Sequence, residues 1–360
     1  MKTLKDLVSS LATADSTTGA VGIDIGSSSI KVVELQERNE VLTLTTYGEL
    51  QLGPYMGKPL GESVQLEPKS EQEALVDVIR ESAVTARNAV FAMPLSSSFV
   101  TNVSIEADAD ADLAPMVRVE ARKVIPASLS EVTLDWAEVE HVEGKNEEAN
   151  RRDVLIAAIQ NNALERFKVL MQFAGFKQPP TEIECFSAIR GLYEAKKPNT
   201  VVIDIGATSA KLYIARDSLL MRMHRVRAGG AVATHEIAKA FEIEFEEAEE
   251  MKYKADRSDK RFSELQKAHN ASYQRAFREF GQVLREYEQK TQHSIDVVFL
   301  TGGGVLFPGI DSMIKDALNK DVEFADPFSK VAYPAFMADT IKDIGPSFAV
   351  ALGAALRNFE

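Results

Sequence analysis

The stretch that decides the fold is VGIDIGSSSIKVVEL, residues Val21–Leu35, together with its near copy VVIDIGATSAKLYI, residues Val201–Ile214. When Ile23–Lys31 is aligned with Ile203–Lys211, the Ile, Asp, Ile, Gly, Ser and Lys positions are identical. In both copies an apolar run leads into a turn of small residues, and a second apolar run follows. The pattern predicts a buried strand, a tight turn and a second strand, present once in each half of the chain.

The repeated turn carries the residue types that bind a polyphosphate. Asp24 and Asp204 stand at the ends of their strands, where a carboxylate can hold Mg²⁺ directly or through its waters. Gly26 and Gly206 let the backbone approach a ligand closely. Small residues follow whose N–H groups can turn toward phosphate oxygens. These small residues are Ser27, Ser28, Ser29, Ala207 and Thr208. Two ordinary hairpins with buried structural Asp residues are the alternative, but the matching registers favour phosphate binding.

A third segment, DVVFLTGGGVLFPGI at Asp296–Ile310, supports a nucleotide site. It predicts a buried strand, a turn made by Gly302, Gly303 and Gly304, and then a helix, so that a ligand can reach the backbone and a helix N-terminus. The segment has neither the G-K-[ST] of a Walker A motif nor a G-x-G-x-x-G dinucleotide motif. P-loop and Rossmann folds therefore lose support.

Composition limits the class of protein. The chain has 360 residues, of which 45% are hydrophobic, and a net charge of −13. These values are typical of a soluble globular protein with about two domains or one duplicated body. The excess of acid argues against nucleic acid as the main partner. The single cysteine, Cys185, allows no disulfide within the chain and indicates a cytosolic compartment. No apolar run reaches the roughly 18–20 residues that a membrane span needs.

The first nineteen residues predict a short amphipathic segment. Met1, Leu4, Leu7, Val8 and Leu11 recur at helical spacing. Two interpretations stay open: a weak contact with a membrane or partner, or a helix docked on its own domain.

These three segments, in this order, resemble the actin-like ATPase superfamily, an α/β fold with a duplicated ribonuclease H-like core. The sequences of two segments, Ile23–Leu35 and EIECFSAIR at Glu182–Arg190, are similar to those of the type IV pilus assembly protein PilM family, in the branch that also holds FtsA. That family usually has Pro where Cys185 stands. The resemblance covers nearly the whole chain from about residue 20.

The resemblance implies four subdomains behind the N-terminal segment 1–19. Core subdomain 1A would span 20–93 and be completed by about 346–360. An inserted α/β subdomain of the FtsA and PilM type, 1C, would span 94–180. Core subdomain 2A would comprise 181–230 and 294–345, and a helical lid, 2B, would comprise 231–293.

The resemblance also implies ATP and Mg²⁺ as ligands. Asp24 and Asp204 would serve the metal, and the two turns and the triple glycine would surround the phosphates and the adenosine. Lys31 and Lys211 follow the turns on strands whose orientation toward the cleft stays open. Gly229 and Gly230, and Glu249 and Lys252 in the lid, complete the expected cofactor-binding set. A solvated helix start is the alternative for the acidic lid segment.

Hydrolysis is less certain than binding. It needs a group that orients the attacking water, and in the superfamily a carboxylate or amide at the start of the helix before the second turn does this. Glu184 matches that position as the candidate catalytic residue, and a buried structural carboxylate is the rival interpretation. Whether the chain is an enzyme is left open.

For function, the resemblance implies a nucleotide-loaded scaffold at the cytoplasmic face of the inner membrane. It would capture the N-terminal tail of a PilN-like membrane protein in a groove between the first core subdomain and the insert. Val119, Val124, Ile125 and Leu129 either line this groove or belong to the core. The chain ends at Ala351–Glu360 without an amphipathic tail, so attachment through a partner is expected. Other pilus assembly partners and a homo-oligomer are left open.

Two alternatives belong to the same superfamily. One is an FtsA-like cell-division protein that tethers to the membrane, against which the missing C-terminal amphipathic helix counts. The other is a small-molecule kinase, which needs a carboxylate base beside its substrate pocket. No Asp between the two turns stands out for that role.

Overall fold

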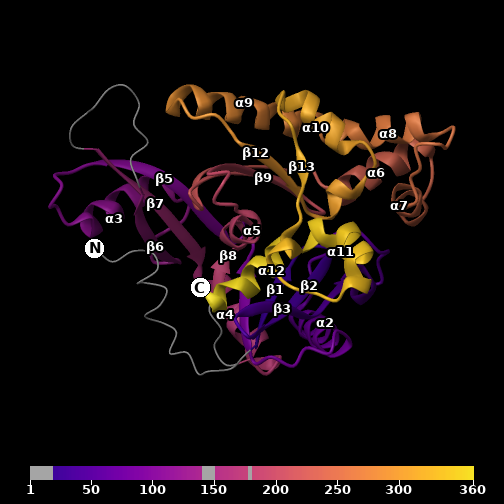
Figure 1. The fold of residues 1–360 in the computed structure, drawn as a ribbon, viewed down its shortest axis with the longest axis horizontal. Coiled ribbons are helices and arrows are strands. Elements are labelled where there is room, and N and C mark those ends of the chain that lie inside the picture. Colours follow the sequence, from indigo (N-terminus) through magenta and orange to yellow (C-terminus); the bar gives the residue numbers. More distant parts are fainter. Residues whose placement is uncertain (1–18, 140–150, 177–180) are drawn as a thin grey trace.

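The computed structural model describes residues 19–139, 151–176 and 181–360. Residues 1–18 of the predicted N-terminal amphipathic segment, and residues 140–150 and 177–180 of the expected insert, lie outside these residues. Within them, the strands form two five-stranded sheets and one three-stranded sheet (Figure 1).

The first sheet contains the first of the repeated hairpins. Its strand order is β3-β2-β1-β4-β8. The bounds are β1 (Gly19–Ile25), β2 (Ser29–Arg38), β3 (Val41–Gln51), β4 (Asn88–Met93) and β8 (Thr181–Ile183). β1 is antiparallel to β2 and parallel to β4. The helix α2 (Pro68–Glu81) covers one face of the sheet through Leu75 and Val78, which are buried in the same core as Ile23 and Phe91.

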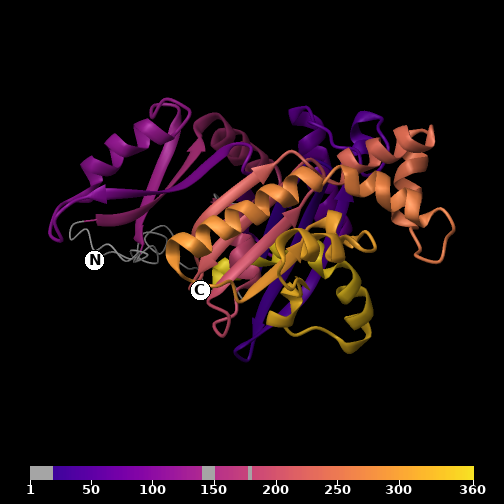
Figure 2. The same cartoon turned by 90° about the horizontal axis from the view of Figure 1, so that it is seen from above.

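The second sheet repeats the first. Its order, β11-β10-β9-β12-β13, matches the first sheet strand for strand. The bounds are β9 (Asn199–Ile205), β10 (Ala210–Arg216), β11 (Leu219–Val226), β12 (Val297–Thr301) and β13 (Glu323–Phe324). The helices α9 (Gln274–Thr291) and α10 (Ile310–Leu318) cover one face of it, with α9 in orange lying along the strands in Figure 2. The duplicated core predicted from the repeat is confirmed.

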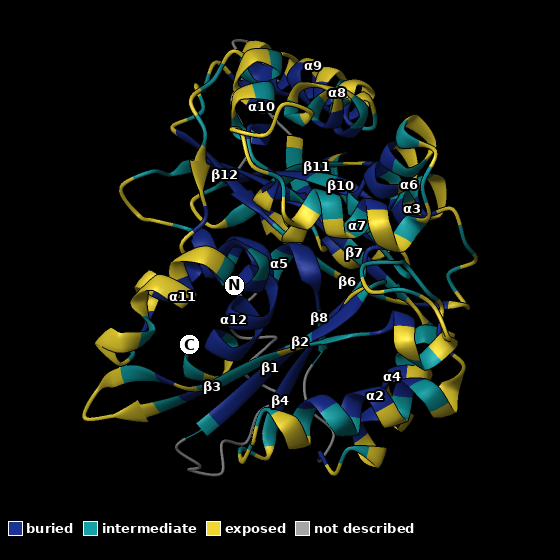
Figure 3. Ribbon diagram, turned by 90° about the vertical axis from the view of Figure 1, so that its right-hand side faces the viewer, coloured by how far each residue is buried: buried dark blue, intermediate teal, exposed yellow. Residues whose placement is uncertain are grey.

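Two helices cross between the sheets. They are α5 (Glu184–Leu192) and α12 (Ala349–Leu356), and Figure 3 shows both as buried elements. A Cβ on Gly353 would lie 1.8 Å from the Ser187 carbonyl oxygen, and one on Gly22 would lie 1.9 Å from the Ala351 carbonyl oxygen. α12 is therefore clamped against both α5 and β1 at positions where only glycine fits.

The insert forms the third sheet, with the order β5-β7-β6. Its elements are β5 (Ser98–Glu106), α3 (Leu113–Val124), β6 (Val132–Val139), β7 (Arg151–Gln160) and α4 (Asn161–Phe173). α3 packs on this sheet through Val117 and Ala121. α4 reaches the first sheet instead, since the ring of Phe167 meets that of Phe91 edge-on at 6.2 Å between centroids.

The helices expected to form one lid divide into two groups. α6 (Gly230–Phe241), α7 (Phe245–Tyr253) and α8 (Phe262–Ala271) share a small core that includes Ile237, Leu265 and Phe307. α9 belongs to the second sheet, because its apolar stripe of Phe277, Phe280, Val283, Leu284 and Tyr287 is buried there.

The chain returns to the first sheet earlier than the expected limit at 345. From η3 (Pro327–Lys330) onward, through η4 (Ala335–Met337), α11 (Ala338–Ile344), η5 (Gly345–Phe348) and η6 (Arg357–Phe359), it packs beside β2 and β3. Phe328 and Ile341 are buried with Leu35 and Leu44. Burial of these apolar side chains on β2 and β3, rather than on the second sheet, is the physical reason for the difference.

Candidate functional site

A cavity of about 710 Å³ lies where the two sheets, the insert and the lid meet; we call it the central cleft. Its walls contain all but one of the residues that the sequence predicts to bind the nucleotide or the metal or to act in catalysis. They are Asp24, Gly26, Ser27, Ser28, Ser29, Lys31, Glu184, Asp204, Gly206, Ala207, Thr208, Lys211, Gly230, Glu249, Lys252, Gly302, Gly303 and Gly304. Three segments far apart in the sequence therefore share one site.

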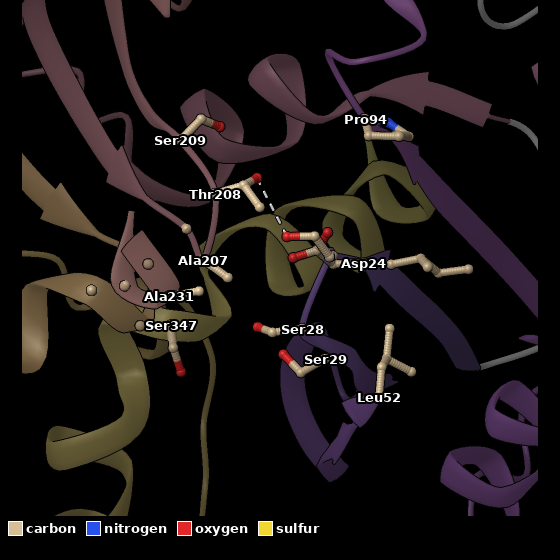
Figure 4. Close-up of a pocket in the computed structure, with 18 of the residues that line it drawn as sticks. Asp24, Ser28, Ser29, Leu52, Pro94, Ala207, Thr208, Ser209, Ala231 and Ser347 are labelled. Carbon is tan, nitrogen blue, oxygen red and sulfur yellow. Dashed lines mark hydrogen bonds between the residues drawn. The ribbon is translucent and has the colours of Figure 1, made fainter. Parts of the chain in front are cut away.

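The two hairpins face each other across this cleft (Figure 4). Each turn is closed by the same backbone bond, from the Gly26 N–H to the Ser29 carbonyl at 2.9 Å and from the Gly206 N–H to the Ser209 carbonyl at 3.0 Å. The two turns touch where the Ser27 Oγ lies 3.4 Å from the Thr208 Oγ1. The gap between them suits a small anionic group that accepts from backbone N–H groups.

The two carboxylates at the strand ends differ in their partners. Asp24 has no hydrogen bond or ion pair with any residue that the structure describes, and burial raises its pKa from 3.8 to about 6. Asp204 is 6% exposed and pairs with the Lys211 Nζ at 3.0 Å, and burial raises its pKa as well. The negative charge of the Asp24 carboxylate is therefore unfavourable in this environment, and a bound cation would neutralise it.

Both lysines point into the cleft but toward different neighbours. The Lys31 Nζ donates to the Ser29 Oγ at 2.8 Å and pairs with Glu49 at 3.1 Å. The Lys211 Nζ donates to Glu184 at 2.7 Å and to Asp204 at 3.0 Å. Burial alone would lower the pKa of Lys211, but the charges of Asp204 and Glu184 outweigh it and raise that pKa.

Glu184 begins α5 and is held at both oxygens. It is 6% exposed; its Oε1 accepts from the Leu95 N–H at 2.7 Å and its Oε2 accepts from Lys211. The carboxylate therefore joins the loop after β4 to the second hairpin. Nothing in this geometry tests a catalytic role, which stays a prediction.

The start of α6 is fixed on the second hairpin. The Gly230 N–H donates to the Gly206 carbonyl and the Ala231 N–H to the Ala207 carbonyl, each at 2.9 Å. A Cβ on Gly229 would lie 2.4 Å from the Ala207 carbonyl oxygen. Gly229, the one nominated residue outside the cleft wall, is thus needed for this close approach.

The lid residues form a small polar cluster. Lys252 pairs with Glu249 at 2.6 Å, donates to the Gly230 carbonyl at 3.1 Å and donates to the Thr234 Oγ1 at 2.7 Å. Burial lowers the pKa of Lys252, and the charge of Glu249 opposes that effect. Gly61 of the first half approaches Glu249 so closely that a Cβ there would lie 2.4 Å from the Oε1. The cluster therefore sits at a contact between the two halves.

The triple glycine forms a 3₁₀ turn, η2 (Gly303–Leu306), and the helix predicted after it begins only at Ile310. Gly302 has a φ of 88°, and its N–H donates to the Pro346 carbonyl at 2.9 Å. A Cβ added to Gly303 would meet nothing within 4 Å. The turn is thus tied to the C-terminal segment while its middle stays open to a ligand.

Several lining residues were missed by the sequence analysis. They are Glu49, Leu52, Glu71, Ser97, Arg166, Arg225, His269, Tyr273, Leu306, Phe307 and Ser347, among others. Only the sequences of β3 and β11 offer a signal for two of these residues, because the strand pairing places Glu49 opposite Lys31 and Arg225 opposite Lys211.

The lining of the central cleft extends to α2 and α4, where the first sheet meets the insert. The buried Glu71 of α2 receives two hydrogen bonds from Arg166 of α4, at 2.6 and 2.8 Å. None of the four expected groove residues lines the cleft. Ile125 is buried and Val124 and Leu129 are partly buried in the core of the insert, whereas Val119 is 52% exposed.

Two features are absent from the described part of the chain. No helix there is long and apolar enough to cross a membrane. Nor do three or more His, Cys, Asp or Glu side chains gather there in a way that could hold a metal ion by themselves.

Comparison with known proteins identifies the family of this chain. A model described as type IV pilus assembly protein PilM matches residues 22–359. The chain is also similar to a solved structure described as the PilM-PilN type IV pilus biogenesis complex, with 25% identity and a TM-score of 0.78. That match covers 95% of this chain and 98% of the other.

More distant structures share the fold alone. The ethanolamine utilization protein EutJ from Carboxydothermus hydrogenoformans is 15% identical, with a TM-score of 0.56 over 94% of this chain and 90% of that one. MreB5 of Spiroplasma citri bound to ADP is 13% identical, with a TM-score of 0.55 over 96% of each chain. The chain has the actin-like ATPase fold, and with the family model matching almost its whole length it belongs to the type IV pilus assembly protein PilM family.

Proposed function

We propose that this protein is a nucleotide-binding scaffold of type IV pilus assembly. It binds Mg·ATP in the central cleft and the N-terminal tail of a PilN-like inner-membrane protein where α2 and α4 line that cleft. The observation that carries the proposal is the meeting of both Asp-Gly hairpins and the triple-glycine turn in one cleft. The relatives support it, since one is a PilM-PilN complex and another a fold relative bound to ADP.

The residues present fit a magnesium nucleotide. Asp24 and Asp204 would hold Mg²⁺, whose preferred ligands are oxygens and which keeps several waters, so two carboxylates suffice. The ion would supply charge neutralisation at the phosphates. The chain's own contribution is the two turns, which line the cleft, and the open backbone at Gly303.

Binding rather than turnover is the proposed activity. Glu184 already accepts from the Leu95 N–H through one oxygen and from Lys211 through the other, so an attacking water would have to share an oxygen whose charge Lys211 partly neutralises. Hydrolysis, where it occurs, should accordingly be slow.

A protein partner explains how an acidic chain reaches a membrane. A net charge of −13 repels anionic lipid, so direct adsorption is unfavourable. The tail would bind where Glu71 of α2 and Arg166 of α4 line the cleft together with the apolar side chains of Leu52 and Phe167. A short peptide with apolar side chains suits such a lining.

Calorimetry with Mg·ATP tests the nucleotide site. We expect the wild type to bind, and Asp24→Ala and Asp204→Ala each to lose tight binding. The exposed acid Asp321, paired with Lys315 outside the cleft, provides the control Asp321→Ala, which should bind normally. Unchanged affinity in both cleft variants would refute the site assignment.

Fluorescence anisotropy with the labelled N-terminal peptide of the cognate PilN-like protein tests the partner site. Arg166→Ala should weaken binding at least about tenfold, a loss of about 1.4 kcal/mol. Arg275→Ala, whose exposed side chain pairs with Glu279 on α9, should bind the peptide like the wild type. Absence of peptide binding by the wild type would rule out this half of the proposal.

A further inference from the structure

His269 of α8 is a buried polar side chain in an aromatic wall of the central cleft. It is 1% exposed and lines the cleft. Its ring stacks on Phe307 with 3.7 Å between centroids and 13° between planes, and lies 5.1 Å from the ring of Tyr273. Phe307 directly follows the triple-glycine turn, so the imidazole sits beside the segment expected to receive adenosine.

One ring nitrogen of His269 is already paired. The Nδ1 lies 3.0 Å from the Asn270 Oδ1, which can only accept, so the hydrogen belongs on Nδ1. Burial, with a smaller contribution from the Lys252 charge, lowers the pKa of His269 from 6.5 to about 4. The neutral ring therefore presents its Nε2 as a hydrogen-bond acceptor.

That acceptor has no partner among the residues that the structure describes. Unlike the Tyr273 hydroxyl, which is fully enclosed and unpaired, the His269 Nε2 is open to the cleft. Phenylalanine would provide the same stacking, whereas the imidazole adds an acceptor that a group in the cleft can pair with. The Nε2 is therefore the polar atom of this wall that a ligand can reach.

The position of the wall identifies which part of a nucleotide would reach it. The second hairpin holds Gly230 through the Gly206 carbonyl, Lys252 donates to the Gly230 carbonyl, and the Lys252 charge acts on His269. When the phosphates bind at the hairpins, His269, which lies at the other end of this series of contacts, faces the base. Adenine presents an amino donor at position 6 of its ring, whereas hypoxanthine presents an oxygen acceptor there.

We propose that His269 is a specificity-determining residue, whose Nε2 accepts from the 6-amino group of a purine and disfavours a 6-oxo purine. The inference rests on the proposed nucleotide site and goes beyond it by assigning base selection to one atom. A 6-oxo group would set one lone pair against another and leave both unpaired.

The test compares the affinities of Mg·ATP and Mg·inosine triphosphate by calorimetry. The wild type should bind ATP about ten- to a hundredfold more tightly, as expected for one lost hydrogen bond at a buried site. In His269→Phe the ratio should fall close to one, mainly through weaker ATP binding. His235→Phe, exposed on α6 and outside the cleft wall, should keep the wild-type ratio.

Each outcome decides the matter. Equal binding of the two nucleotides by the wild type would overturn the inference, and this arm does not depend on the folding of any variant. A wild-type ratio retained in a folded His269→Phe would overturn it as well, while leaving the nucleotide site intact. Failure of the wild type to bind either nucleotide would refute the proposed function and the inference together.

Discussion

The two hairpins of the central cleft share a backbone but not a charge arrangement. In both, the Asp lies directly opposite the Lys across an antiparallel pair: Asp24 opposite Lys31, and Asp204 opposite Lys211. Yet only Lys211 pairs with its Asp, whereas Lys31 turns to Glu49. Closely similar local sequences have thus produced two different sites.

The third strand of each sheet accounts for this difference. Lys31 lies opposite the acid Glu49 on β3, which attracts it, whereas Lys211 lies opposite the cation Arg225 on β11, which repels it. Lys211 therefore turns toward Asp204 and Glu184. The two halves therefore share the geometry of the turn. The residue on β3 or β11 decides whether the Asp is left unpaired, as Asp24 is in the first half, or is paired with the Lys, as Asp204 is in the second.

The largest expected effect comes from removing Lys211. Lys211→Met leaves Asp204 and Glu184 buried without their shared cation, which should cost about 3–5 kcal/mol of unfolding free energy. Lys31→Met, the matched variant, should cost about 1 kcal/mol, because Glu49 is 33% exposed. Urea unfolding measures both. Equal losses would show that the two hairpins are energetically alike.

Neutralisation should affect the stability of the folded protein more at Asp24 than at Asp204. The folded pKa of Asp24, about 6, lies above its ordinary 3.8, so the charged form penalises the folded state; this penalty is full above pH 6 and vanishes toward pH 4. Asp24→Asn should therefore stabilise the nucleotide-free protein by about 2–3 kcal/mol at pH 8 and by little at pH 4. Burial also raises the pKa of Asp204, but Lys211 offsets part of that penalty, so Asp204→Asn should stabilise the folded state less than Asp24→Asn does. Thermal unfolding in EDTA measures both effects, and a destabilising Asp24→Asn would contradict the account.

Glu184→Gln separates a structural carboxylate from a catalytic one. The amide can still accept from Leu95 but no longer carries the charge that holds Lys211, so we expect a loss of about 2 kcal/mol in stability. Mg·ATP binding should persist. Turnover measured in parallel decides between roles: a large drop in hydrolysis with unchanged stability would favour catalysis.

The smallest expected effect tests the role of β3 in placing Lys31. Glu49→Gln removes the acid that draws Lys31 away, at a cost of about 0.5 kcal/mol for a partly exposed pair. The freed Lys31 can then approach Asp24, so the pKa of Asp24 should fall. NMR titration of the Asp24 carboxyl carbon would detect this, and an unchanged pKa would show that Lys31 is held by Ser29 instead.

The repeat predicted the hairpins and the duplicated core, and the segment Asp296–Ile310 predicted the glycine turn, because each rests on local chemistry. The repeat did not predict where the lysines point, since that depends on residues eighteen and fourteen positions further on in β3 and β11. Nor did local patterns reveal His269 or Ser347, which reach the cleft only through tertiary packing. The return of the chain to the first sheet at η3 was likewise decided by burial of Phe328 and Ile341.

The most direct test of the central claim is a crystal structure with a non-hydrolysable ATP analogue and Mn²⁺, whose anomalous signal locates the metal. The account predicts phosphates between the turns at 26–29 and 206–208, with the metal beside Asp24 and Asp204. A nucleotide bound elsewhere, or a metal remote from both carboxylates, would contradict it.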